Sequence, residues 1–118
     1  MTFDRDPCSG MWYGLDHLPI DRAAVESVFN DPKRIIKQTR LGASVLVSTV
    51  FLVIDHAFTV GEHVPLLYET AALDGPEDLM RRFPTKDQAL KCHDVFVTYL
   101  KDTYPEQCRP RWFHRLSR

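Results

Sequence analysis

The chain has few cysteines, few glycines, no excess charge of either sign and no long apolar run. Its three cysteines, Cys8, Cys92 and Cys108, are an odd and widely spaced set, which argues against a disulfide framework and indicates a reducing compartment. Fifteen Lys and Arg against sixteen Asp and Glu give a formal charge of −1, so no global field attracts nucleic acid or an anionic membrane. The longest apolar stretch, residues 45–54, is about half the roughly 20 residues that a membrane-spanning helix needs.

What is present is typical of one α+β domain. A length of 118 residues, with 44% hydrophobic and 26% charged residues, is ordinary for a single globular unit. We expect an irregular arm over residues 1–19, an α+β core over 20–104 and a basic, aromatic tail over 105–118. The N-terminus has acidic residues where a secretory signal has a basic start and an apolar core, so we expect a cytoplasmic protein.

Capping residues indicate two helices. Asp21 is a typical N-cap and precedes a short apolar stripe, which predicts a helix over about 22–29. Thr85 and Gln88 have the spacing of a capping box and predict a helix from residue 86 to about 104. The residues that recur on one face of this second helix, and should pack on a sheet, are Ala89, His93, Phe96 and Leu100.

Four strand-like segments lie between the two helices. Residues 43–54 are almost wholly apolar, as expected of a central strand covered on both faces or nearly so, and residues 33–41 are half polar, as expected of an edge or half-exposed strand. Residues 66–73 and about 78–83 complete the set. The predicted fold is therefore a four-stranded antiparallel sheet with an N-terminal and a C-terminal helix packed on it, in the order α-β-β-β-β-α.

Several short segments carry a resemblance. They are V-S-T-V-F-L at 47–52, Ile54-Asp55-His56, Phe58, P-L-L-Y-E-T at 65–70, R-F-P-T at 82–85, Ala89 and His93. Together they resemble a family of small proteins of bacteriophages, prophages and their bacterial hosts, over about residues 45–93. Val53 stands where the family more often has glycine. The resemblance implies a bacterial or phage cytoplasmic setting and the α+β arrangement, and it implies no activity.

One group of polar residues could carry chemistry: Asp55, His56, Glu69 and His93. If they converge at one edge of the sheet, they could bind a divalent metal or act as a general acid and base. The alternative is a buried hydrogen-bond network in which a carboxylate fixes His93. No motif such as H-E-x-x-H accompanies the group, so we favour the network, although His56, Glu69 and His93 remain weak metal candidates. We expect no cofactor, and we expect Glu69 and His93 to lie within reach of each other.

The C-terminal tail is different in kind. Its candidate partner-binding residues are Arg109, Arg111, Trp112, Phe113 and Arg115. Arg and Trp are frequent at binding hot spots, and the same mixture can hold phosphates and stack on bases. In the alternative, Trp112 and Phe113 fold back over the sheet and the arginines are solvated.

Two functions follow from these features. The favoured one is a non-enzymatic, phage-associated interaction protein that binds a host or phage macromolecule. Its partner would be a protein, or nucleic acid held by the tail, and not a membrane. The other is a small metal-dependent hydrolase that uses the Asp55, His56, Glu69 and His93 group.

Overall fold

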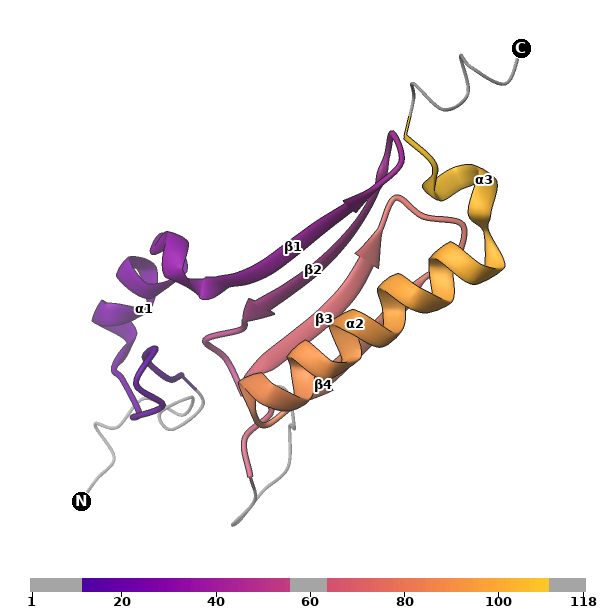
Figure 1. The fold of residues 1–118 in the computed structure, drawn as a ribbon. Coiled ribbons are helices and arrows are strands. Elements are labelled where there is room, and N and C mark those ends of the chain that lie inside the picture. The colour runs from indigo at the N-terminus through magenta and orange to yellow at the C-terminus, as the bar shows by residue number, and fades with distance from the viewer. Residues whose placement is uncertain (1–11, 56–63, 111–118) are drawn as a thin grey trace, which may run out of the picture.

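The computed structural model describes residues 12–55 and 64–110 and has an α+β fold (Figure 1). Its elements, in chain order, are α1 (Arg22–Phe29), η2 (Pro32–Arg34), β1 (Ile35–Leu41), β2 (Val45–Phe51), β3 (Tyr68–Leu73), β4 (Leu79–Phe83), α2 (Lys86–Thr103) and α3 (Pro105–Cys108). The predicted order α-β-β-β-β-α is confirmed. The short 3-10 turn η2 and the one-turn helix α3 are additions that the sequence analysis did not predict.

The four strands form an antiparallel meander in the order β1-β2-β3-β4. One cross-strand row shows the register: Thr39 pairs with Val47, Val47 pairs with Ala72, and Ala72 pairs with Leu79. The apolar segment 43–54 therefore supplies a central strand, as predicted, although the strand is shorter than that segment. It ends before Val53, whose φ of 71° lies in the left-handed region that β-branched residues avoid.

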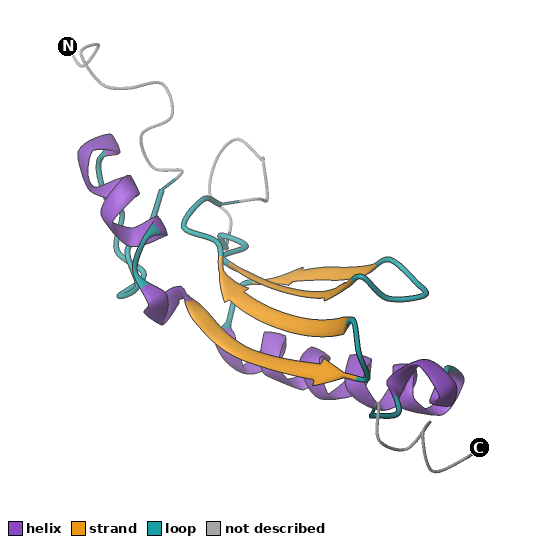
Figure 2. Cartoon of the chain, turned by 90° about the horizontal axis from the view of Figure 1, so that it is seen from above, coloured by secondary structure: helices purple, strands orange, loops and turns teal. Residues whose placement is uncertain are grey.

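Helix α2 covers one face of the sheet, and among the described residues no helix covers the opposite face (Figure 2). The predicted N-cap is confirmed, because the Thr85 hydroxyl accepts a hydrogen bond of 3.2 Å from the Gln88 N–H. Ala89 and Leu100 are fully buried against the strands, and Phe96 packs beside them. The expectation that β2 is covered on both faces, or nearly so, is confirmed for burial, because its side chains are all buried or half-buried, although among the described residues only one face has a helix on it.

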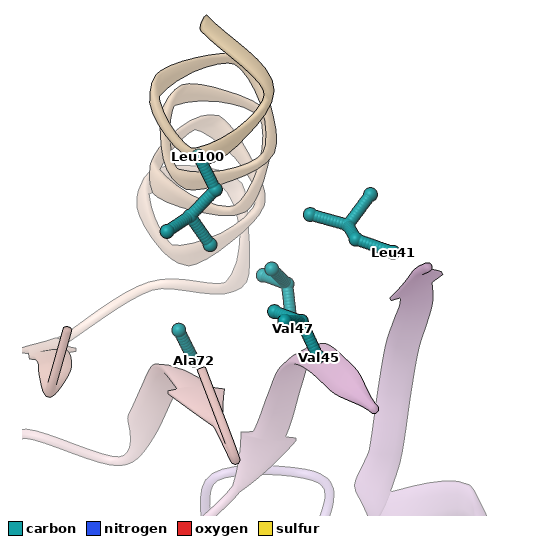
Figure 3. Close-up of a cluster of buried hydrophobic side chains, with 5 residues drawn as sticks. All are labelled: Leu41, Val45, Val47, Ala72 and Leu100. Atoms are coloured by element: carbon teal, nitrogen blue, oxygen red, sulfur yellow. The ribbon is translucent and has the colours of Figure 1, made fainter. Parts of the chain in front are cut away.

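The core under α2 is built from aliphatic side chains. Leu100 points from the helix toward side chains of β1, β2 and β3 (Figure 3). The members of this cluster are Leu41, Val45, Val47, Ala72 and Leu100. Each fully buried Leu or Val stabilises the fold by about 1.5–3 kcal/mol, so this cluster is what holds α2 on the sheet.

A second core cluster lies at the end of the sheet where the N-terminal arm and α1 meet it. Its buried members are Phe51, Val53, Leu67, Tyr68 and Ala89. Val25 and Val28 of α1 pack against this cluster, but α1 has no buried residue of its own. In Figure 1 α1 lies beyond the start of β1, whereas α2 runs across the sheet.

The turn between β1 and β2 contacts α3. Gly42 has a φ of +65°, and a Cβ placed on it would lie 2.1 Å from the carbonyl oxygen of Gln107. Cys108 of α3 packs against the aliphatic cluster. Residues 105–108, which the sequence analysis assigned to the tail, are therefore helical and in contact with the core. Within the described ranges, no helix is long and apolar enough to cross a membrane.

Candidate functional site

The predicted contact between Glu69 and His93 is wrong. Thr70 faces α2, because its hydroxyl donates a hydrogen bond of 2.8 Å to the carbonyl oxygen of Ala89. Since neighbouring residues of a strand point to opposite faces, Glu69 faces away from α2. Its Oε2 accepts a hydrogen bond of 3.0 Å from Nε of Arg82, the residue directly opposite it on β4.

His93 lies fully buried between α2 and the sheet, and its hydrogen-bond partners are two threonines instead of a carboxylate. Its Nδ1 lies 2.8 Å from Oγ1 of Thr49, and its Nε2 lies 2.8 Å from Oγ1 of Thr39. Oγ1 of Thr49 also lies 2.7 Å from Oγ1 of Thr70. A single chain of hydrogen bonds therefore joins β1, β2, β3 and α2.

The hydroxyl protons in this chain determine the tautomer of His93. Thr70 donates its only hydroxyl proton to Ala89, so it must accept from Thr49. Thr49 then has no proton left for His93 and must accept from an Nδ1–H. Nε2 of the neutral ring accepts from Thr39. Burial lowers the pKa of His93, Lys37 lowers it further and Asp94 opposes them, which agrees with a neutral ring.

The network has a structural role. His93, Thr49 and Thr70 are completely buried, so no substrate reaches the imidazole or either hydroxyl. The favoured hydrogen-bond interpretation holds for His93, with hydroxyls as its partners. Sequence reasoning missed Thr39 and Thr49 as these partners, and Thr70 as the next member of the hydrogen-bond chain. The available signal was Thr49 and Thr70 within apolar strands, since a buried hydroxyl needs a partner.

Asp55, which lies beyond the end of β2, has a separate structural role. Its side chain is buried, and its Oδ1 accepts a hydrogen bond of 2.9 Å from the backbone N–H of Leu66. This contact ties together the two ends of the connection between β2 and β3. His56 lies outside the described residues. Within residues 12–55 and 64–110, no group of three or more His, Cys, Asp or Glu is placed to hold a metal ion.

The tail candidates fall mostly outside the described part of the chain. Arg109 forms an ion pair with Glu106 in α3. Arg111, Trp112, Phe113 and Arg115 lie beyond the last described residue. Their assignment to partner binding stays a prediction.

The face of the sheet opposite α2, hereafter the uncovered face, has features of a binding surface. Its side chains lie in three rows across the strands: Arg40, Leu46, Leu73 and, directly before β4, Asp78; then Gln38, Ser48, Ala71 and Met80; then Ile35, Val50, Glu69 and Arg82. Leu73 is 47% exposed and Met80 is 48% exposed, which is high for large apolar side chains of a sheet.

A hollow of about 610 Å³ lies on the uncovered face between β3 and β4. The small Ala71 contributes to its lining, together with Leu73 and Met80, and the ion pair between Glu69 and Arg82 contributes its charged part. The hollow therefore combines apolar walls with a neutralised pair of charges and one further carboxylate, that of Asp78. Such a surface suits the side chains of another protein better than a strongly charged ligand.

No family model, curated protein or solved structure matches the chain. Functional inference therefore rests on the geometry of the described residues.

Proposed function

We propose that the protein is a non-enzymatic interaction protein of the bacterial cytoplasm, phage-associated, that binds another protein through the uncovered face of its sheet. The observation that supports this proposal is the exposure of large apolar side chains next to small ones on that face. Antiparallel sheets often leave one face to solvent, but such a face is then mainly polar. Here about half of the twelve side chains in the three rows are apolar.

The polar residues of the uncovered face also favour a protein partner. Arg40 and Asp78 lie at opposite edges of the sheet, and the ion pair of Glu69 with Arg82 lies in another row. Apolar centres with charged edges are the usual composition of protein–protein interfaces. A nucleic-acid surface would instead carry a cluster of unpaired positive charges.

The alternative of a metal-dependent hydrolase has less support. The three described residues on which it depends do not converge: Glu69 and His93 occupy opposite faces, and Asp55 binds the backbone of Leu66 in the connection after β2. Each of these three has protein partners that account for its position. The hydrolase would need a different set of residues.

The experiment compares capture by the wild-type protein with capture by surface variants. Tagged protein is used to retain partners from the native bacterial lysate and to retain an untagged copy of the same chain. Leu73→Glu and Met80→Glu place a charge on the uncovered face. Val95→Glu is the matched control, because Val95 is exposed on the outer side of α2.

We expect the wild-type protein and the Val95→Glu control to retain the same partner, and both variants of the uncovered face to lose it. All three variants should keep the melting temperature of the wild type to within a few degrees, since the replaced side chains are exposed. Equal retention by every variant would contradict the proposal. Loss of the partner on nuclease treatment would point to nucleic acid instead.

A further inference from the structure

We propose that the partner of the uncovered face is a second copy of this chain, packed face to face about a twofold axis parallel to the strands, between β2 and β3. This inference rests on the proposed function, because it names the protein that the uncovered face binds. The argument comes from the order of residues across the four strands. The first two rows of that order are complementary to themselves under one particular twofold rotation, and the third places Ile35 and Val50 opposite the neutralised pair of Arg82 and Glu69.

The first row shows the complementarity most directly. Arg40 pairs in register with Leu46, and Leu46 pairs with Leu73. Asp78 follows on the other side of Leu73: it directly precedes Leu79, the partner of Ala72, and it lines the same hollow as Leu73. The row therefore has a positive charge at one end, a negative charge at the other and two leucines between them.

A twofold axis along the strands exchanges β1 with β4 and β2 with β3. It places Arg40 opposite Asp78 of the second copy, and it does so twice. It also places Leu46 opposite Leu73 twice, in the middle of the contact. Two sheets that pack in this aligned way lie about 10 Å apart, a distance that facing leucines fill and that an arginine can cross.

The next row allows the close approach that the leucines need. Ser48 comes to lie opposite Ala71, and both are small residues near the centre of the face. Gln38 comes to lie opposite Met80. The sheet centre therefore offers no bulky group that would hold the two copies apart.

Neither Arg40 nor Asp78 has a hydrogen bond or ion pair within the part of the chain that the structure describes. A twofold axis perpendicular to the strands would instead place Asp78 opposite Arg82 of the second copy, a residue that Glu69 already neutralises. It would place Arg40 opposite Ile35 of the second copy. The axis along the strands pairs both free charges. Exposed ion pairs add little affinity, but like charges in the same places oppose binding, so these two residues determine the alignment.

The test is charge reversal followed by its rescue, with the dimer constant of the full-length protein measured by sedimentation velocity. We expect a concentration-dependent dimer for the wild type. Arg40→Asp places an acidic residue opposite Asp78 of the second copy, and Asp78→Arg places a basic residue opposite Arg40 of the second copy. Each single variant should weaken the dimer by about tenfold or more, because two attractive contacts become repulsive.

Two combinations restore the attraction. The double variant Arg40→Asp with Asp78→Arg has the charges exchanged, so it should dimerise as well as the wild type. An equimolar mixture of the two single variants should form a heterodimer, because every acidic position then faces a basic one. Lys91→Asp and Asp102→Arg are the matched controls, since they reverse exposed charges on α2 and should leave the dimer unchanged.

Each outcome has a defined meaning. A wild-type monomer at the highest attainable concentration overturns this inference, and so does a dimer that the double variant and the mixture fail to restore. If the chain is monomeric while Leu73→Glu still abolishes the capture of a different protein, the inference fails and the proposed function stands. If Leu73→Glu changes neither dimerisation nor capture, the proposed function fails as well.

Discussion

Replacing Thr49 with valine tests the hydrogen-bond chain under α2. Valine has nearly the shape of threonine, so Thr49→Val leaves no cavity and removes only the hydroxyl. The Nδ1–H of His93, now 2.8 Å from Oγ1 of Thr49, would then be buried without an acceptor. An unsatisfied buried polar group costs about 1–3 kcal/mol, so we expect the free energy of unfolding to fall by that amount. For a domain of this size, each kcal/mol lowers the melting temperature by roughly 4 °C.

The measurement is urea unfolding, in which a lower midpoint at unchanged slope reports lost stability. Ser48→Ala is the matched control: it removes a hydroxyl from the next residue, on the opposite face, where Oγ accepts a hydrogen bond of 3.2 Å from the amide of exposed Gln38, which water can satisfy instead, so we expect a smaller loss, below about 1 kcal/mol. His93→Leu supplies the decisive comparison. In a protein that already lacks the imidazole, Thr49→Val leaves no buried N–H without an acceptor. We expect the two substitutions to be coupled by about 1 kcal/mol or more. Additive effects would refute the assignment of the Nδ1–H tautomer and its acceptor.

Three further outcomes are expected. Because burial lowers the pKa of His93 below 6.5, the unfolded chain takes up the proton before the folded protein does as the pH falls. The stability contributed by neutral His93 is therefore complete above about pH 6.5 and is lost as the pH falls below it. We expect urea midpoints to fall more steeply between about pH 7 and 5 for the wild type than for His93→Leu. The Val53→Gly variant should be about 1–2 kcal/mol more stable than the Val53→Ala variant, because glycine adopts a φ of 71° without strain. Alanine is usually the more stabilising of these two residues, so an alanine variant that unfolds at the higher temperature would contradict this prediction. Gly42→Ala should lower the melting temperature more than Gly75→Ala does, since only the first substitution places a Cβ 2.1 Å from a backbone oxygen, that of Gln107. Equal effects of the two substitutions would show that the turn and α3 are not in contact.

Local signals in the sequence were sufficient for the elements. The capping box at Thr85, the apolar stripe through Ala89 and Leu100, and the apolar segment 43–54 act over a few neighbouring residues, and the structure confirms all three. The boundary at Pro105 was less informative. Proline stops α2 there, but it also begins the next helical turn, because a proline is tolerated at the first position of a helix.

The candidate site depended on register, which the sequence could not supply. A shift of one residue in the pairing of two strands exchanges the faces of all their side chains. The structure pairs Thr49 with Thr70 and Val50 with Glu69, and this puts the threonines under α2 and the glutamate on the other face. The same two strands in a register shifted by one would have changed what lies beside His93.

By itself, the sequence determined the fold class, the two main helices, the central position of residues 43–54 and the burial of His93, because these depend on local periodicity, capping and hydrophobicity. Only the tertiary structure decided the threonine partners of His93, the contact of Gly42 with α3 and the row from Arg40 to Asp78. These residues are far apart along the chain, and the pairing of strands and the docking of α2 on one face bring them together. Short-range preferences specify which elements form, whereas long-range packing determines which side chains they bring together.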